Sequence, residues 1–165
     1  MALTEIPTGS EVFVDANVFI YHFAGRSADC TALLARIEQG GLRGLTGPFE
    51  VLEVAHRLMM LEAVELGMTA RPSPAAQLAR RPDLVRRLSK YYFSIMAIPR
   101  MGLEVLPLPP DFMSASQEFR QSHGLRVGDS LVVMHMRQAG VSVLASADEA
   151  FDRVPGIRRF GPADV

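Results

Sequence analysis

The sequence predicts an α/β protein, specifically a three-layer α/β/α sandwich with a central, mostly parallel sheet. Short apolar runs alternate with longer stretches of helical spacing, and this order is typical of a parallel sheet with crossover helices. The candidate strands show little polar alternation, as expected when helices cover both faces of a sheet. A chain of 165 residues is long enough for one full core and short for two, so we predict a single domain over residues 1–165.

Apolar runs and helix signals define the elements of the first half. Leu33, Leu34 and Ile37 share one face of a predicted helix that ends in a double glycine. Pro48 fits the first turn of a long helix, where its missing N–H has no partner to lose. The predicted elements are a strand at 11–15, a helix at 18–25, a helix at 27–41, a strand at 42–47 and a helix at 48–67.

The second half begins with a connection and returns to the same alternation. Residues 68–82 are rich in Pro, Ala, Ser and Arg, which indicates a connection with at most one short helix. Leu84, Leu88, Tyr92 and Ile95 then have helical spacing. The predicted elements are helix 83–98, strand 102–109, helix 111–123, helix 128–140, strand 141–146, short helix 148–154 and edge strand 156–160.

Composition excludes several classes of protein. No apolar run approaches the roughly 18 residues that a membrane span needs, and the first ten residues lack the features of a secretory signal. Cys30 is the single cysteine, so an internal disulfide and a cysteine metal cluster are excluded within one chain. We therefore predict a cytoplasmic protein.

The charge of the chain gives evidence for nucleic-acid binding only in one local segment. The formal net charge of −1 provides no overall field for a polyanion, so any contact with nucleic acid depends on a local patch. One basic segment exists at residues 71–90. Such a run is more often a solvated helix face, and an RNA-binding patch is the less common alternative. Its basic residues are Arg71, Arg80, Arg81, Arg86, Arg87 and Lys90.

Four acids fall where a parallel sheet presents its carboxyl edge. Asp15 ends the first strand, Asp148 lies just after the strand at 141–146, and Asp129 opens a helix. Glu53 lies in the second turn of the helix that follows the second strand. Ligands of open parallel sheets bind outside this edge. Four carboxylates gathered there would repel one another unless a cation balanced them, and Mg²⁺ or Mn²⁺ prefers such oxygen ligands.

Each acid also has a simpler interpretation. Asp15 and Asp148 can cap helices, and Asp129 can stabilise the positive end of its own helix. Glu53 can be a solvated residue paired with Arg57 one turn later. The combination therefore carries more information than any one member. If the cluster forms, it supports metal-dependent hydrolysis of phosphodiesters, in which one or two ions activate a water.

Four stretches resemble, in order, the signature regions of PIN domains, and in particular of VapC-like ribonucleases from bacterial toxin–antitoxin pairs. They are VFVDANVFIYHF, LTGPFEVLEVAHRL, GLRVGDSLVVMHMRQAG and VSVLASADEAFDRVPGI. The pattern of the family falls on Asp15, Glu53, Asp129 and Asp148. Residues 68–100 match less clearly, and the stretch between Glu53 and Asp129 is longer than in compact members.

The resemblance implies an α/β/α sandwich and a Mg²⁺- or Mn²⁺-dependent endoribonuclease that cleaves RNA. It also implies a homodimer and a small antitoxin that blocks activity. Asn17 and Ser146 would orient the carboxylates by hydrogen bonds. Glu50 shares the helix face of Glu53, so either acid could be the ligand, although the family phrase fits Glu53.

Other functions stay open at this stage. Within the fold, the rivals are a non-toxin PIN nuclease of RNA maturation and a catalytically inactive binding module. A phosphoryl-accepting domain that uses Asp15 is a third. Asp152 has helical spacing from Asp148, but a surface acid paired with an arginine is the expected role. Met59 and Met60 are expected in the core, with contact to an antitoxin helix as the alternative.

Overall fold

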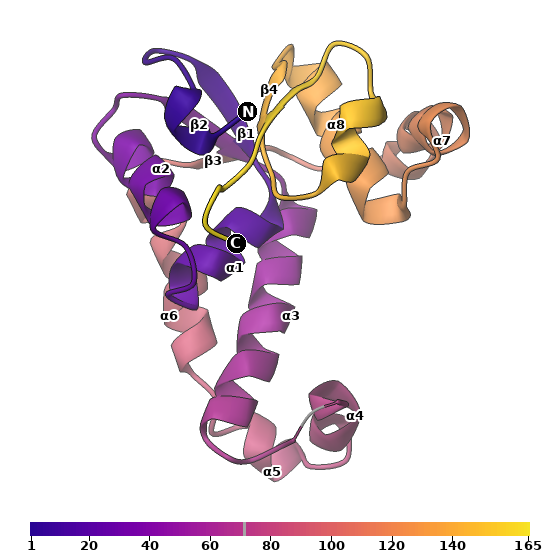
Figure 1. The fold of residues 1–165 in the computed structure, drawn as a ribbon. Helices are drawn as coiled ribbons and strands as arrows, with labels where there is room; N and C mark the ends of the chain where they lie inside the picture. Colours follow the sequence, from indigo (N-terminus) through magenta and orange to yellow (C-terminus); the bar gives the residue numbers. More distant parts are fainter. Residues whose placement is uncertain (71) are drawn as a thin grey trace.

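The computed structural model describes residues 1–70 and 72–165. Its centre is a five-stranded sheet in which every neighbouring pair is parallel, in the order β3-β2-β1-β4-β5. The predicted parallel sheet is therefore confirmed (Figure 1). The strands are β1 (Glu11–Val14), β2 (Arg43–Thr46), β3 (Glu104–Val105), β4 (Val143–Ala145) and β5 (Arg158–Phe160).

Helices cover both faces of the sheet, as the fold class requires. In Figure 1, α7 and α8 lie on one side and the larger group with α1, α2, α3 and α6 on the other. The helices are α1 (Ala16–Phe23), α2 (Ala28–Glu38), α3 (Pro48–Glu65), α4 (Pro74–Ala79), α5 (Pro82–Val85), α6 (Lys90–Ala97), α7 (Phe112–His123) and α8 (Val127–Ala139). Short 3₁₀ turns are η1 (Leu3–Glu5), η2 (Pro99–Met101) and η3 (Glu149–Arg153).

Strand β1 divides the core into two parts. Val12 and Val14 point into a cluster with the helices α1, α2 and α3, whereas Phe13 points to the opposite face, toward α8. All three side chains are fully buried. This alternation is the period-two geometry of a strand covered on both faces. It fixes β1 at the centre of the sheet and holds the next residue, Asp15, at its carboxyl edge.

Two predicted elements differ from the structure. The strand predicted at 102–109 is reduced to Glu104–Val105, because its one neighbour, β2, ends at Thr46. The last bond between the two strands runs from the N–H of Leu106 to the carbonyl of Thr46. The helix predicted at 83–98 is divided into α5 and α6. Tyr91 rather than Tyr92 packs against the core, and Tyr92 is 54 % exposed. The predicted apolar stripe was therefore wrong at Tyr92, whereas Ile95 packs against the core as predicted.

The carboxylate of Glu62 causes this break. It lies on α3 and accepts hydrogen bonds from the backbone N–H groups of Ser89, Lys90 and Tyr91 at 2.9–3.0 Å. These are free N–H groups of the first turn of α6, which a side chain normally satisfies. Although burial raises the pKa of Glu62, these hydrogen bonds outweigh it, so the pKa lies below its usual value. A long-range cap therefore starts a new helix at Lys90.

Replacing Glu62 with alanine should destabilise the protein by about 1–3 kcal/mol, because three N–H groups lose their acceptor. Urea unfolding of the two proteins measures this difference. The loss should also speed proteolysis between α3 and α6. Glu65→Ala is the matched control, since Glu65 contributes one exposed ion pair to Lys90. Equal stability of the two variants would show that the cap is unimportant.

No helix within residues 1–70 and 72–165 combines the length and the apolar character needed to cross a bilayer.

Candidate active site

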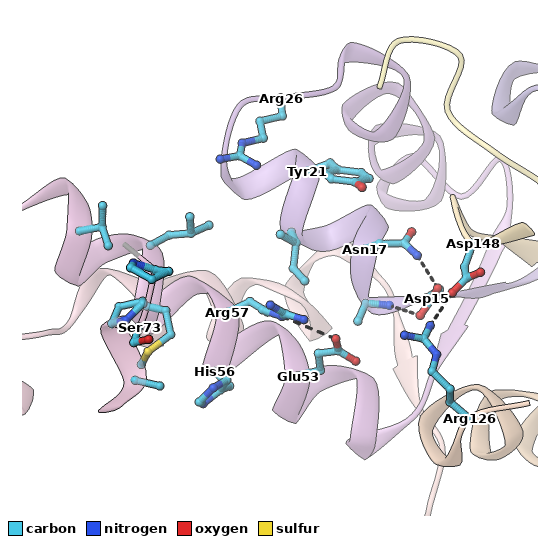
Figure 2. Close-up of a pocket in the computed structure, with 18 of the residues that line it drawn as sticks. Asp15, Asn17, Tyr21, Arg26, Glu53, His56, Arg57, Ser73, Arg126 and Asp148 are labelled. Carbon is cyan, nitrogen blue, oxygen red and sulfur yellow. Dashed lines mark hydrogen bonds and ion pairs between the residues drawn. The ribbon is translucent and has the colours of Figure 1, made fainter. Parts of the chain in front are cut away.

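The four predicted acids line one cavity of about 940 Å³ at the carboxyl edge of the sheet. Asp15 and Asp148 come from the ends of β1 and β4, Glu53 from α3 and Asp129 from α8. The cavity extends from these acids along α3 to the beginning of α4, where Ser73 lies in Figure 2. Four distant parts of the chain therefore meet in one place, as the sequence predicts.

Asp15 is held from three sides. Its Oδ2 accepts hydrogen bonds from the hydroxyl of Ser146 at 2.6 Å and from the amide of Asn17 at 2.5 Å. Its Oδ1 accepts from the N–H of Ala16 at 2.7 Å, so Asp15 is also the N-cap of α1. Asn17 further accepts from the N–H of Ala147 at 3.1 Å, which joins the ends of β1 and β4. The position of the carboxylate is thus fixed before any ligand arrives.

This environment makes Asp15 a weaker acid than usual. Burial raises the pKa of Asp15 to about 6; the hydrogen bonds from Ser146 and Ala16 oppose the shift, and the charges of Glu53 and Asp129 add to it. The charged form is penalised by low polarity and like charge, which a bound cation would relieve. A positive group that lies against Asp15 would therefore stabilise its charged form.

Arg126 supplies positive charge to the other side of the cluster. Its Nε lies 2.9 Å from Asp129 Oδ2 and its Nη2 lies 2.6 Å from Asp148 Oδ2. Asp148 also caps η3 by accepting from the N–H of Ala150 at 2.9 Å. The Arg126 side chain is 76 % exposed, so it can leave the pair by rotation without moving the backbone. Figure 2 shows Arg126 reaching toward Asp148 and Asp15.

The two glutamates of α3 have different places. Glu53 faces the cavity and pairs loosely with Arg57 at 3.8 Å, so the expected ion pair and the position in the acid cluster are both present. Glu50 is 1 % exposed and does not line the cavity. Its carboxylate lies against Gly47 beside His135, and neither side chain has a hydrogen-bond partner among the described residues. Of the two, Glu53 is placed to bind a ligand in the cavity.

The donor set fits a hard divalent cation. Carboxylate oxygens are the ligands that Mg²⁺ and Mn²⁺ prefer, and an arginine already lies between two of them. No group of three or more His, Cys, Asp or Glu side chains within residues 1–70 and 72–165 is arranged to hold an ion as it stands. In the structure, Arg126 contacts Asp129 and Asp148, and Ser146 and Asn17 contact Asp15.

Some residues around the cavity were not predicted from the sequence. Arg126 was missed, although its i, i+3 spacing to Asp129 at the start of a helix was a usable signal. Tyr21 and Arg26 also line the cavity and gave no signal. Asp152 pairs with Arg159 at 2.8 Å, as expected for a surface acid. Arg71 lies outside the described residues.

The comparisons agree with this fold. The family model described as PIN domain matches residues 12–157. The chain therefore belongs to the PIN domain family. No curated protein sequence matches it significantly.

Three solved structures share the fold of this chain. VapBC2 of Rickettsia felis, bound to a DNA fragment of its promoter, has a TM-score of 0.55 at 12% identity, covering 92% of this chain and 98% of that chain. A toxin–antitoxin complex of Klebsiella pneumoniae has a TM-score of 0.53 at 16% identity. The match covers 89% of this chain and 95% of that chain. VapC20 of Mycobacterium tuberculosis, a toxin that cleaves the sarcin–ricin loop, has a TM-score of 0.56 at 14% identity. The match covers 87% of this chain and 95% of that chain.

Proposed function

We propose that this protein is a divalent-metal-dependent endoribonuclease of the VapC type, the toxin of a toxin–antitoxin pair. The observation that carries the proposal is the meeting of Asp15, Glu53, Asp129 and Asp148 in one cavity beside an exposed arginine. Membership of the PIN family supports it. VapC20, which shares the fold, is described as a toxin that cleaves the sarcin–ricin loop, and this description also supports the proposal.

The four acids would hold Mg²⁺ or Mn²⁺. The ion would supply Lewis acidity, lowering the pKa of a water and neutralising charge on the phosphodiester. Ser146 and Asn17 fix the orientation of Asp15, a task that hydrogen-bonded neighbours of metal ligands commonly perform. A bound cation would favour the ionised form of Asp15, because it would offset the burial and like-charge penalties that raise the pKa of this carboxyl. Asp129 and Asp148 would have to exchange their contacts with Arg126 for contacts with the cation.

Basic groups along the cavity would bind the RNA. Arg57 on α3 and Arg26 after α1 both line it and are exposed. Arginine binds phosphate by paired N–H donors. Tyr21 offers an aromatic ring near the same wall (Figure 2), and aromatic rings stack on unpaired bases. These side chains bind and orient the strand while the acids remain free for the cation.

We further propose a small antitoxin as partner and a homodimer as the assembled state. One solved relative is described as a toxin–antitoxin complex, and another is VapBC2 bound to a DNA fragment of its promoter. Light scattering of the purified chain, alone and after co-expression with any small protein encoded beside it, tests both statements. A monomer that binds no neighbour product would favour a nuclease outside toxin–antitoxin systems.

The direct test is cleavage of RNA by the purified protein. We expect internal cleavage with Mg²⁺ or Mn²⁺ and none after EDTA treatment, with activity restored by added ion. The matching DNA oligonucleotide is the control for substrate class. Cleavage that persists in EDTA would reject metal dependence, and an inert protein with every ion would reject the enzyme in favour of a binding module.

Replacing Arg126 with glutamine should tighten Mn²⁺ binding by about 5-fold or more, because the arginine competes with the cation for Asp129 and Asp148. Titration calorimetry of the metal-free proteins measures the effect. Arg158→Gln is the control, since Arg158 is equally charged, exposed and outside the cavity. Equal affinities for Mn²⁺ in wild type and Arg126→Gln would mean that the arginine does not occupy the position of the cation.

A further inference from the structure

Residues 72–88 form an arm at the far end of α3, away from the sheet (Figure 1). The arm contains α4 and α5 and is held by its own small core, in which Leu78, Leu84 and Leu88 pack against Ala63 of α3. Glu62 fixes the point where the chain returns, through the cap of α6. The arm is therefore a packed part of the protein with a set position relative to α3.

The arm and the four acids share one cavity. Pro72, Ser73, Pro74, Ala75 and Ala76 line its distal end, and the acids line the other. Along α3, the lining runs from Glu53 to Val64, which corresponds to about 16 Å of helix. A groove of this length is suited to a strand of several nucleotides, more than the single phosphodiester that the acids can contact.

Positive charge is concentrated on the arm. Residues 72–88 contain four arginines and one acid, whereas the whole chain has a net charge of −1. Arg81 pairs with that acid, Asp83, at 2.9 Å. The other three arginines are exposed and have no ion-pair partner among the described residues; they are Arg80, Arg86 and Arg87. None of the three lines the cavity itself, so they would contact a polyanion that extends beyond its distal end.

We propose that the arm is a second RNA contact, in which Arg80, Arg86 and Arg87 bind phosphates of a strand several nucleotides away from the bond at the four acids. The proposal rests on the proposed function for the identity of the polyanion. A second copy of this chain is a poorer occupant, because two arms of like charge repel. Contacts of this kind hold the strand without touching the reacting atoms, and they depend strongly on salt.

The test measures RNA binding without cleavage. A fluorescein-labelled 20-nucleotide RNA is titrated with protein in EDTA at several salt concentrations, and anisotropy gives the affinity. The triple variant Arg80→Gln, Arg86→Gln, Arg87→Gln should bind about 10-fold more weakly. The slope of log affinity against log salt should also fall by about 2, since each phosphate contact on a single strand contributes about 0.7.

Two matched variants isolate the cause. Arg100→Gln, Arg153→Gln, Arg158→Gln removes the same charge from exposed positions outside both the arm and the cavity and should leave affinity within about 2-fold. Replacing the three arm arginines with lysine keeps the charge and should restore most of the binding and of the slope. The lysine variant also separates a lost contact from a misfolded arm.

Unchanged RNA affinity and salt slope in the glutamine variant would overturn the proposal. Unchanged RNA binding with lost binding of labelled poly-L-glutamate would overturn it in favour of an acidic protein partner. Because binding is read in EDTA, the result is independent of whether the protein cleaves RNA. If it does, the arm variant should raise KM for long RNA about 10-fold while kcat stays within 2-fold, and a fall in kcat alone would contradict a holding role.

Discussion

Replacing Asp15 with asparagine should reduce RNA cleavage by more than about 100-fold while leaving the fold intact. Removing a group that merely supports a metal ligand costs 10- to 100-fold, and Asp15 is itself the proposed ligand. Asparagine is as good a helix cap as aspartate, so the cap on Ala16 survives. The substitution therefore removes the charge and keeps the local structure. Initial rates with Mg²⁺, together with a thermal melt in EDTA, measure the two effects.

Asp164→Asn is the matched control for Asp15→Asn. Asp164 also accepts a hydrogen bond at a helix N-terminus, from the N–H of Ala28 at 2.7 Å, but it does not line the cavity. Its replacement should leave cleavage within about 2-fold. If Asp15→Asn cleaves RNA at the wild-type rate, Asp15 is a cap and no more.

Replacing Glu50 with glutamine should change how stability responds to pH. Burial raises the pKa of Glu50 to about 8, with the charges of Asp15 and Glu53 adding to the shift, although the nearby backbone of Glu50 and Gly47 opposes it. The folded protein thus keeps a proton that the unfolded chain releases above its ordinary pKa of 4.5. An acid with a raised pKa in the folded state costs stability as pH rises, by about 1.4 kcal/mol per pH unit between the two values.

The window from pH 6.5 to 8 isolates this effect, because Asp15, with a pKa of about 6, is mostly ionised there. Over this window wild type should lose about 2 kcal/mol of unfolding free energy relative to Glu50→Gln in EDTA. Glu50→Leu should share the flatter profile and shows that the missing charge is responsible. Parallel pH profiles of wild type and both variants would mean that Glu50 does not titrate in this range.

The position of Glu50 also accounts for a glycine. A Cβ at residue 47 would overlap the Glu50 carboxylate and lie 2.8 Å from His135 Nδ1. Gly47 therefore lets a buried acid pack against the backbone just behind the cavity. In the sequence, Glu50 and Glu53 share one helix face, and the family phrase alone favoured Glu53. Burial separates the two acids in the structure, and no local pattern encodes it.

The parts of the fold that follow from local pattern were predictable. β1, β2 and β4 are apolar runs, and α3 and α8 have clear start and end signals, so the parallel sheet and the positions of Asp15, Asp129 and Asp148 follow from them. Asn17 and Ser146 lie within hydrogen-bond distance of Asp15, where the family pattern indicated.

The features that the sequence did not predict depend on contacts between residues that are distant along the chain. The division of the helix predicted at 83–98 comes from Glu62, which lies more than twenty residues earlier and accepts three N–H groups there. The link between Arg126 and Asp148 joins two elements that meet only after folding. The sequence also gave no sign that the beginning of the arm lines the cavity. This contact depends on where the far end of α3 places the arm.

The central claim is that the four acids bind a divalent cation in place of Arg126. A crystal structure of the protein with Mn²⁺, read by anomalous scattering, tests it most directly. We expect an anomalous peak within about 2.0–2.6 Å of oxygens from at least two of Asp15, Glu53, Asp129 and Asp148, with Arg126 turned away from Asp129 and Asp148. A cavity with no anomalous peak at saturating Mn²⁺, and with Arg126 still paired to both acids, would contradict the account.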